Sequence, residues 1–186
     1  MNAAQSMNLG RLLTHTARLF PEHPALIQGE QTWTWTQINA RVNAMVCALR
    51  ALGIKKGDRI LLQSRNNLQT FENSWAAFKL GCIWVPTNFR LTPPEVAYLG
   101  ASSGAVVMIV EDCFHAHTDA VKDASDSLKH IIVIGTPRTE ELSYEALIAQ
   151  HLGATDAEET VSYDDPLWFF YTSGTTGKPK AGILTH

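Results

Sequence analysis

The chain has 186 residues, of which 45% are hydrophobic and 18% are charged, a composition typical of a globular protein that can bury a core. The formal net charge of -3 and the isoelectric point near 6.1 provide no basic footprint for a nucleic-acid partner. No stretch approaches the ~18 apolar residues of a membrane span, and the N-terminus lacks a signal sequence, so neither a transmembrane segment nor secretion is expected.

The three cysteines, Cys47, Cys82 and Cys113, are too few and too widely spaced for a disulfide framework. Their odd number leaves at least one thiol free, which favours a reducing, cytoplasmic location. We expect three buried or half-buried thiols that pack as small hydrophobic groups, and no catalytic cysteine.

Apolar residues at helical spacing predict an amphipathic helix over residues 8–20, with its apolar stripe facing the core. Pro21 ends it. Residues 25–28 and 31–35 flank a Gly-Glu turn and predict a short hairpin. Thr34 and Gln37 have capping-box spacing and predict the start of a helix that stops at Gly53.

A strand over residues 60–62 and a helix from Leu68 that ends at Gly81 follow, and then a strand over residues 82–85. Thr92, Pro93 and Glu95 predict a clear helix start. Strands over 105–110 and 130–134 enclose a weaker helix over 114–122. This alternation predicts an α/β fold with a mainly parallel sheet and flanking helices.

Residues 136–163 are polar and acidic, and we expect a surface connection broken by one short helix over 144–150. Asp164 and Asp165 are expected to form a turn before Pro166. Residues 167–171 are the most apolar strand candidate and predict a buried strand, and residues 181–184 predict another strand. The sequence contains no internal repeat.

The segment between these last two strands combines hydroxyl side chains, glycines and lysines, as a polyphosphate cradle requires. Glycines let backbone N–H groups approach phosphate oxygens, and hydroxyl and ammonium groups add donors. The residues concerned are Thr172, Ser173, Gly174, Thr175, Thr176, Gly177, Lys178 and Lys180.

Pro179 disfavours a helical conformation at Lys178, so residues 178–180 should be extended, with both ammonium groups able to face one phosphate chain. Two residues separate Gly174 from Gly177, whereas a Walker A loop, as in kinases and GTPases, has four between its glycines. A flexible linker would have a similar composition, but the order of the residues favours phosphate binding.

The segment Tyr171-Thr-Ser-Gly-Thr-Thr-Gly-Lys-Pro-Lys180 resembles the phosphate-loop signature of the acyl-adenylate-forming (AMP-binding) superfamily, which includes acyl-CoA synthetases, luciferases and adenylation domains. The stretches 33–58 and 81–95 are also similar to that family, most of all to acyl-CoA synthetases and fatty-acid–CoA ligases. Ala181 departs from the glycine that the family usually has there.

The resemblance implies that residues 1–186 are the N-terminal portion of the large AMP-binding domain. It also implies a reaction in which a carboxylic acid and ATP give an acyl-adenylate, followed by transfer to coenzyme A. Residues Thr172 to Lys180 would hold the β- and γ-phosphates with Mg²⁺, and Lys180 would be catalytic. No residue is expected to bind a metal directly.

His186 matches a histidine or aromatic position of the family and is interpreted as structural, and His115 and His117 would diverge on a helix. Later family motifs have no counterpart, so we expect an inactive fragment with exposed strand edges and apolar surface. The alternative is a non-catalytic nucleotide- or phosphate-binding fragment. The sequence leaves open the acid, the acceptor and the oligomeric state.

Overall fold

The computed structural model describes residues 7–155, 158–172 and 177–186. Its main feature is a seven-stranded sheet in the order β7-β6-β5-β3-β4-β8-β9, with every neighbouring pair parallel except β8 and β9. The strands are β3 (Arg59–Gln63), β4 (Ile83–Pro86), β5 (Val107–Glu111), β6 (His130–Ile134), β7 (Leu142–Ser143), β8 (Pro166–Thr172) and β9 (Lys180–Thr185). The predicted α/β class with a mainly parallel sheet is confirmed.

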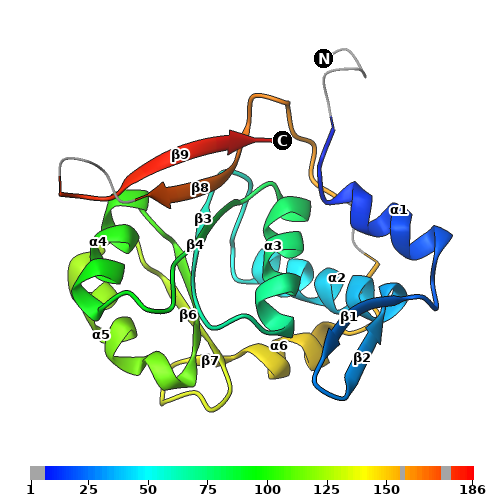
Figure 1. Cartoon of the computed structure of the whole chain (residues 1–186), viewed down its shortest axis with the longest axis horizontal. Coiled ribbons are helices and arrows are strands. Elements are labelled where there is room, and N and C mark those ends of the chain that lie inside the picture. The colour runs from blue at the N-terminus through cyan, green and yellow to red at the C-terminus, as the bar shows by residue number, and fades with distance from the viewer. Residues whose placement is uncertain (1–6, 156–157, 173–176) are drawn as a thin grey trace.

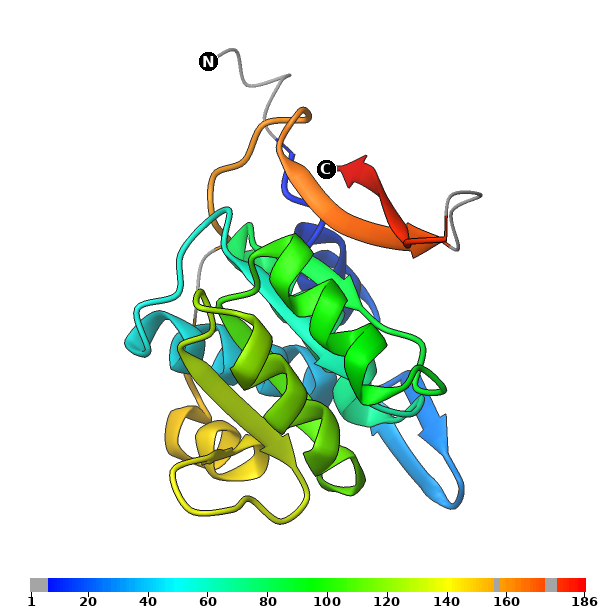
Figure 2. The ribbon, with the colours of Figure 1, turned by 90° about the vertical axis from the view of Figure 1, so that its left-hand side faces the viewer.

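Helices cover both faces of this sheet, as Figures 1 and 2 show. One face carries α4 (Pro93–Ser103) and α5 (His115–Ala124), and the other carries α2 (Trp35–Ala51), α3 (Leu68–Leu80) and α6 (Tyr144–His151). The alternation of side chains along β4 shows the two faces, because Ile83 and Val85 join the core under α4 and α5, whereas Trp84 joins the core under α2 and α3.

The order of the central strands places a topological switch between β3 and β5, since β3 is followed by β4 on one side and β5 lies on the other. In open α/β sheets, ligands bind outside the carboxyl ends of the strands near such a point. The loops after β3 and β4 lie along this edge, and the parallel strand β8 also ends there.

Most predicted element boundaries agree with the structure to within a few residues. The capping box of α2 is present, since the Thr34 hydroxyl accepts from the Gln37 N–H and the Gln37 side chain accepts from the Thr34 N–H. Gly81 ends α3, as predicted, and the structure shows it in the left-handed conformation. The short hairpin of β1 (Pro24–Gln28) and β2 (Gln31–Thr34) is also confirmed.

The first helix, α1, spans Arg11–Leu19 and is shorter than the predicted 8–20. Its stripe faces the core only in part, because Leu13 is buried whereas Leu12, Leu19 and Phe20 are about half exposed. Gly10 precedes this helix and lies so close to α3 that a Cβ there would stand 2.7 Å from the Lys79 backbone nitrogen.

The interpretation of residues 136–163 as a surface connection was wrong in part. Residues Leu142–Ser143 add strand β7 to the edge of the sheet, and Tyr144, at the start of α6, is fully buried. The predicted short helix is present. Its apolar residues pack in the core against α2. The polar composition of the whole segment gave no sign of this packing.

The prediction of a buried strand over residues 167–171 was also wrong in part. The strand β8 exists, but Phe170 is 50% exposed. Its partner β9 is exposed at all six positions, and Ile183 is 60% exposed. The expected open edge with apolar surface is therefore present in the structure.

Candidate phosphate-binding site

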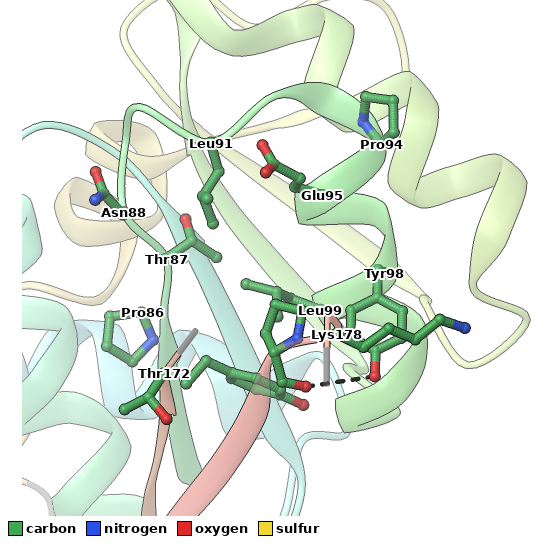
Figure 3. Close-up of a pocket in the computed structure, with 13 residues that line it drawn as sticks. Pro86, Thr87, Asn88, Leu91, Pro94, Glu95, Tyr98, Leu99, Thr172 and Lys178 are labelled. Atoms are coloured by element: carbon green, nitrogen blue, oxygen red, sulfur yellow. Dashed lines mark hydrogen bonds between the residues drawn. The ribbon is translucent and has the colours of Figure 1, made fainter. Parts of the chain in front are cut away.

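A cavity of about 770 Å³ lies beside the carboxyl ends of β4 and β8, where α4 begins and the β8–β9 hairpin meets it (Figure 3). Its walls come from three segments that are distant in sequence. These are the loop after β4, the first two turns of α4, and the two arms of the hairpin. The lining residues are Pro86, Thr87, Asn88, Leu91, Pro94, Glu95, Tyr98, Leu99, Tyr171, Thr172, Gly177, Lys178 and Pro179.

The walls of this cavity are mainly apolar, with polar groups at a few points, as is usual for a small-molecule site. The carboxylate of Glu95 belongs to the helix cap, since it accepts from the Thr92 N–H at 2.7 Å. The Thr92 hydroxyl and N–H lower the pKa of Glu95, so this carboxylate stays ionised.

The structure brings together only some of the predicted loop residues. Thr172, Gly177 and Lys178 line the cavity. Lys180 begins β9, is paired with Thr172 across the ladder and does not line the cavity. Ser173, Gly174, Thr175 and Thr176 lie outside the described residues, so their phosphate-binding role stays a prediction.

Gly177 has a positive φ of 86°, a conformation that residues with a side chain rarely adopt. A Cβ built at this position would have no heavy atom of the described residues within 4 Å. The positive φ therefore favours glycine at this turn.

The base of the loop is attached to α4 through both of its arms. The Ser102 and Tyr171 hydroxyls are 2.9 Å apart, which fixes the β8 arm. The Tyr98 hydroxyl donates to the Pro179 carbonyl at 3.4 Å, which fixes the β9 arm. Residues 98 and 102 are one helical turn apart and face the same side, so one face of α4 contacts both arms.

These α4 residues were not among the predicted site residues. Tyr98 and Ser102 belong to a helix of predominantly apolar and small residues, and such a pattern indicates core packing rather than a site. The four-residue spacing of their hydroxyl groups was the available signal. It becomes informative only once the hairpin is known to lie against α4.

His186 has the structural role that was expected of it. The ring Nδ1 of His186 accepts from the backbone N–H of Leu9 at 3.2 Å. The backbone N–H of His186 donates to the Asp165 carbonyl at 3.2 Å. The ring therefore ties the segment before α1 to the end of β9. Burial lowers the pKa of His186, which keeps the ring neutral and able to accept.

The cysteine prediction holds for two of the three thiols. Cys82 is buried and Cys47 is half-buried, but Cys113 is exposed. Within the described ranges, no group of three or more His, Cys, Asp and Glu side chains is arranged to hold a metal ion. No helix in the part of the chain that the structure describes is long and apolar enough to cross a membrane.

A mainly parallel sheet with a glycine- and lysine-containing hairpin at its carboxyl edge defines an α/β protein of the nucleotide-binding type. The model of the family described as "AMP-binding enzyme" matches residues 13–186. The chain therefore belongs to the AMP-binding enzyme family, as the phosphate-loop resemblance implied.

Curated relatives of this chain are ligases that act on carboxylic acids. The long-chain-fatty-acid–CoA ligase FadD13 of Mycobacterium tuberculosis is 33% identical over 184 residues, which are 96% of this chain and 35% of that protein. The fatty acid–[acyl-carrier-protein] ligase ScoC of Streptomyces coeruleorubidus is 32% identical over 166 residues, 89% of this chain and 30% of that protein. The chain spans about a third of the length of these relatives.

Solved structures show the same fold. The anthranilate CoA ligase AuaEII, in complex with anthranoyl-AMP, has a TM-score of 0.92 and 27% identity, and the match covers all of this chain and 36% of that one. A Mycobacterium tuberculosis fatty acyl CoA synthetase has a TM-score of 0.82 and 29% identity, over 96% of this chain and 34% of that one. These likenesses confirm the fold as the N-terminal part of an adenylate-forming enzyme.

Proposed function

We propose that this chain is the N-terminal portion of the AMP-binding domain of an AMP-forming acid–CoA ligase. In the full-length protein, a substrate carboxylate oxygen attacks the α-phosphorus of ATP and pyrophosphate leaves, which gives an acyl-adenylate. The thiol of coenzyme A then attacks the acyl carbon, and AMP leaves. The observation that carries this proposal is the loop signature from Thr172 to Lys180 in a chain of the AMP-binding enzyme family.

The residues at the base of the loop fit a polyphosphate. Thr172 offers a hydroxyl, Gly177 has no side chain between its backbone and a ligand, and Lys178 and Lys180 supply two positive charges. We assign to these groups the β- and γ-phosphates of ATP, and to Lys180 the stabilisation of charge on the departing pyrophosphate. Mg²⁺ would be held through the phosphate oxygens and would neutralise part of their charge.

The fatty-acid ligases and the anthranilate ligase have different acids in their names. The substrate that we propose is therefore the class of carboxylic acids. We propose coenzyme A as the acceptor, as in most of these named relatives, although the acceptor of ScoC is an acyl-carrier protein. The use of ATP and coenzyme A supports a cytoplasmic location.

Carboxylate-dependent exchange of labelled pyrophosphate into ATP tests the proposed function in the full-length protein. We expect exchange that requires both an acid and Mg²⁺, with a panel of fatty and aromatic acids as probes. ATP binding without acid-dependent exchange would instead support a non-catalytic nucleotide-binding protein, and the ligase proposal would fail.

Titration of the chain with pyrophosphate tests the loop itself. We expect Lys178→Met and Lys180→Met each to weaken binding about tenfold or more, because hydrogen bonds to charged groups contribute about 1.5–3 kcal/mol. Lys129→Met is the matched control, since this exposed lysine precedes β6, which is four strands away from β8 in the sheet. Equal affinities in all three variants would exclude the loop as the phosphate site.

A further inference from the structure

Three hydroxyl groups of the cavity lining are already hydrogen-bonded within the protein. The Thr87 hydroxyl donates to the Leu62 carbonyl at 2.8 Å. The Tyr98 hydroxyl donates to the Pro179 carbonyl at 3.4 Å, and the Tyr171 hydroxyl is paired with a serine of α4 at 2.9 Å. Since these side chains line the cavity, what they offer to a ligand is mainly a methyl group and two aromatic rings.

The other side chains on the α4 side of the cavity are apolar or engaged elsewhere. Leu91, Pro94 and Leu99 line it with aliphatic groups, and Figure 3 shows Leu91 pointing from its loop in the direction of Leu99. Glu95 accepts twice at the N-terminal cap of α4. The Asn88 amide oxygen accepts from its own loop, and Figure 3 shows this amide on the side of the loop opposite Leu99.

The polar side chains that remain lie on the hairpin. In the described part of the chain, Thr172 and Lys178 line the cavity without a hydrogen bond to another described residue. The cavity is therefore polar where the hairpin borders it and apolar where α4 and the loop after β4 border it.

This division decides which part of a substrate fits against the α4 side. The adenine ring of ATP and the pantetheine arm of coenzyme A carry hydrogen-bonding groups, which cost free energy when they are buried without partners. The alkyl or aryl part of a carboxylic acid carries none, and it is stabilised by leaving water. The volume of about 770 Å³ lies within the range of small-molecule sites, roughly 300–1,000 Å³.

We propose that the α4 side of this cavity binds the apolar part of the carboxylic acid, with Leu91 and Leu99 as its contacts. The inference rests on the proposed function, because the acid is a substrate only of that reaction. It assigns to the wall formed by α4 and the loop after β4 a preference for acids with an alkyl or aryl group over acids with a hydroxylated one.

NMR of the methyl-labelled chain tests the contact without any reaction. Octanoate and benzoate, as the alkyl and aryl probes, should shift the methyl signals of Leu91 and Leu99 saturably, and adenosine should not. Ile183 and Leu184, which are exposed on β9, are the internal controls. The inference would be overturned by shifts with adenosine alone, by no shift with either acid, or by equal shifts at the β9 controls, which would show indiscriminate binding to apolar surface.

Acid-dependent pyrophosphate exchange by the full-length protein tests the same contact in the reaction. Leu91→Asn keeps the approximate size of the side chain but not its apolar character, so it should raise the KM for octanoate about five- to tenfold and leave the KM for ATP unchanged. Leu91→Met, which stays apolar, should change neither. Leu152→Asn is the matched control, because Leu152 is exposed at the end of α6 and does not line this cavity.

The outcomes separate this inference from the proposed function. An unchanged KM for octanoate in Leu91→Asn, or an equal rise in the KM for ATP, would overturn the inference while exchange itself continues. The absence of acid-dependent exchange in the unmodified protein would overturn the proposed function and the inference with it. Leu91→Ala, which removes most of the apolar contact without adding a polar group, serves as the second variant if Leu91→Asn does not fold.

Discussion

Single residues decide how the two ends of the described chain are held together. The His186 ring is the clearest case, because its Nδ1 must carry no proton in order to accept from the Leu9 N–H. Burial favours this neutral form, and the pKa of His186 is lowered from its ordinary value of 6.5. The contact is therefore sensitive to pH in a predictable direction.

We expect His186 to contribute stability above about pH 6.5 and to lose this contribution as the pH falls through its lower folded-state pKa. The sign follows because the unfolded chain binds the proton more readily than the folded chain. Urea unfolding between pH 5 and 8 measures the effect. The control is His186→Asn, whose amide oxygen can accept from Leu9 but does not titrate.

The difference in unfolding free energy between the unmodified chain and His186→Asn should be constant at pH 7–8. Below pH 6.5, the unmodified chain should lose stability relative to His186→Asn. A difference that is independent of pH would contradict the assigned role of the ring.

Residue-level reasoning from sequence missed the buried charges. Lys79 is 1% exposed and donates to Thr14, Asn39 and Asn43, each at 2.7 Å, whereas Glu72 is buried beside Arg41. Both charged residues lie on α3, where a lysine and a glutamate are ordinarily read as solvent-exposed. Their burial depends on partners from α1 and α2, and no local pattern records those partners.

At the scale of elements, local signals predicted the fold well where they were strong. The capping boxes at Thr34 and Thr92, the stop at Gly81 and the β-branched run of β6 all lie where the sequence indicated. These signals work because the groups that satisfy a helix end are near neighbours in sequence.

The cap of α2 offers a direct test of this point. We expect Thr34→Ala to lower the free energy of unfolding by about 1 kcal/mol, since the Gln37 N–H loses its acceptor at the helix start. Thr34→Ser keeps the hydroxyl and should cost much less. Urea denaturation of both variants measures the difference, and equal stabilities would show that the cap is unimportant here.

Elements that depend on distant partners were predicted less well. Strand β7 has two residues, too few for any periodicity, and exists because β6 lies beside it. The burial of Tyr144 follows from the packing of α6 against α2. Residue order predicted a phosphate loop over residues 172–180, a role that stays a prediction. The contacts of Tyr171 and Pro179 with α4 could not be predicted, because they depend on how the hairpin lies across that helix.

For the whole molecule, the most consequential feature is the exposed strand β9 at one edge of the sheet. All six residues of β9 pair with β8, which is the one strand beside β9 among the described residues, and Ile183 and Leu184 are 60% and 48% exposed. Unprotected apolar edge strands promote association between chains. Phe170 on β8 extends the same apolar surface.

We therefore expect the chain to associate at micromolar concentrations and Ile183→Lys to reduce this association, because a charge on an edge strand opposes pairing. Size-exclusion chromatography with light scattering over a concentration series measures it. Lys129→Met, far from β9, is the control. If the unmodified chain is monomeric at all concentrations, β9 does not mediate association between chains.

Gly10 lies so close to Lys79 that a side chain at residue 10 would have to separate the two backbones. Gly10 has an ordinary right-handed conformation, so an alanine there meets no backbone penalty and acts only through its methyl group. That single carbon would push the first helix outward and would strain the Leu9 and His186 contact with it. Adding one methyl group at residue 10 would thus weaken a hydrogen bond made by residue 186, at the other end of the described chain.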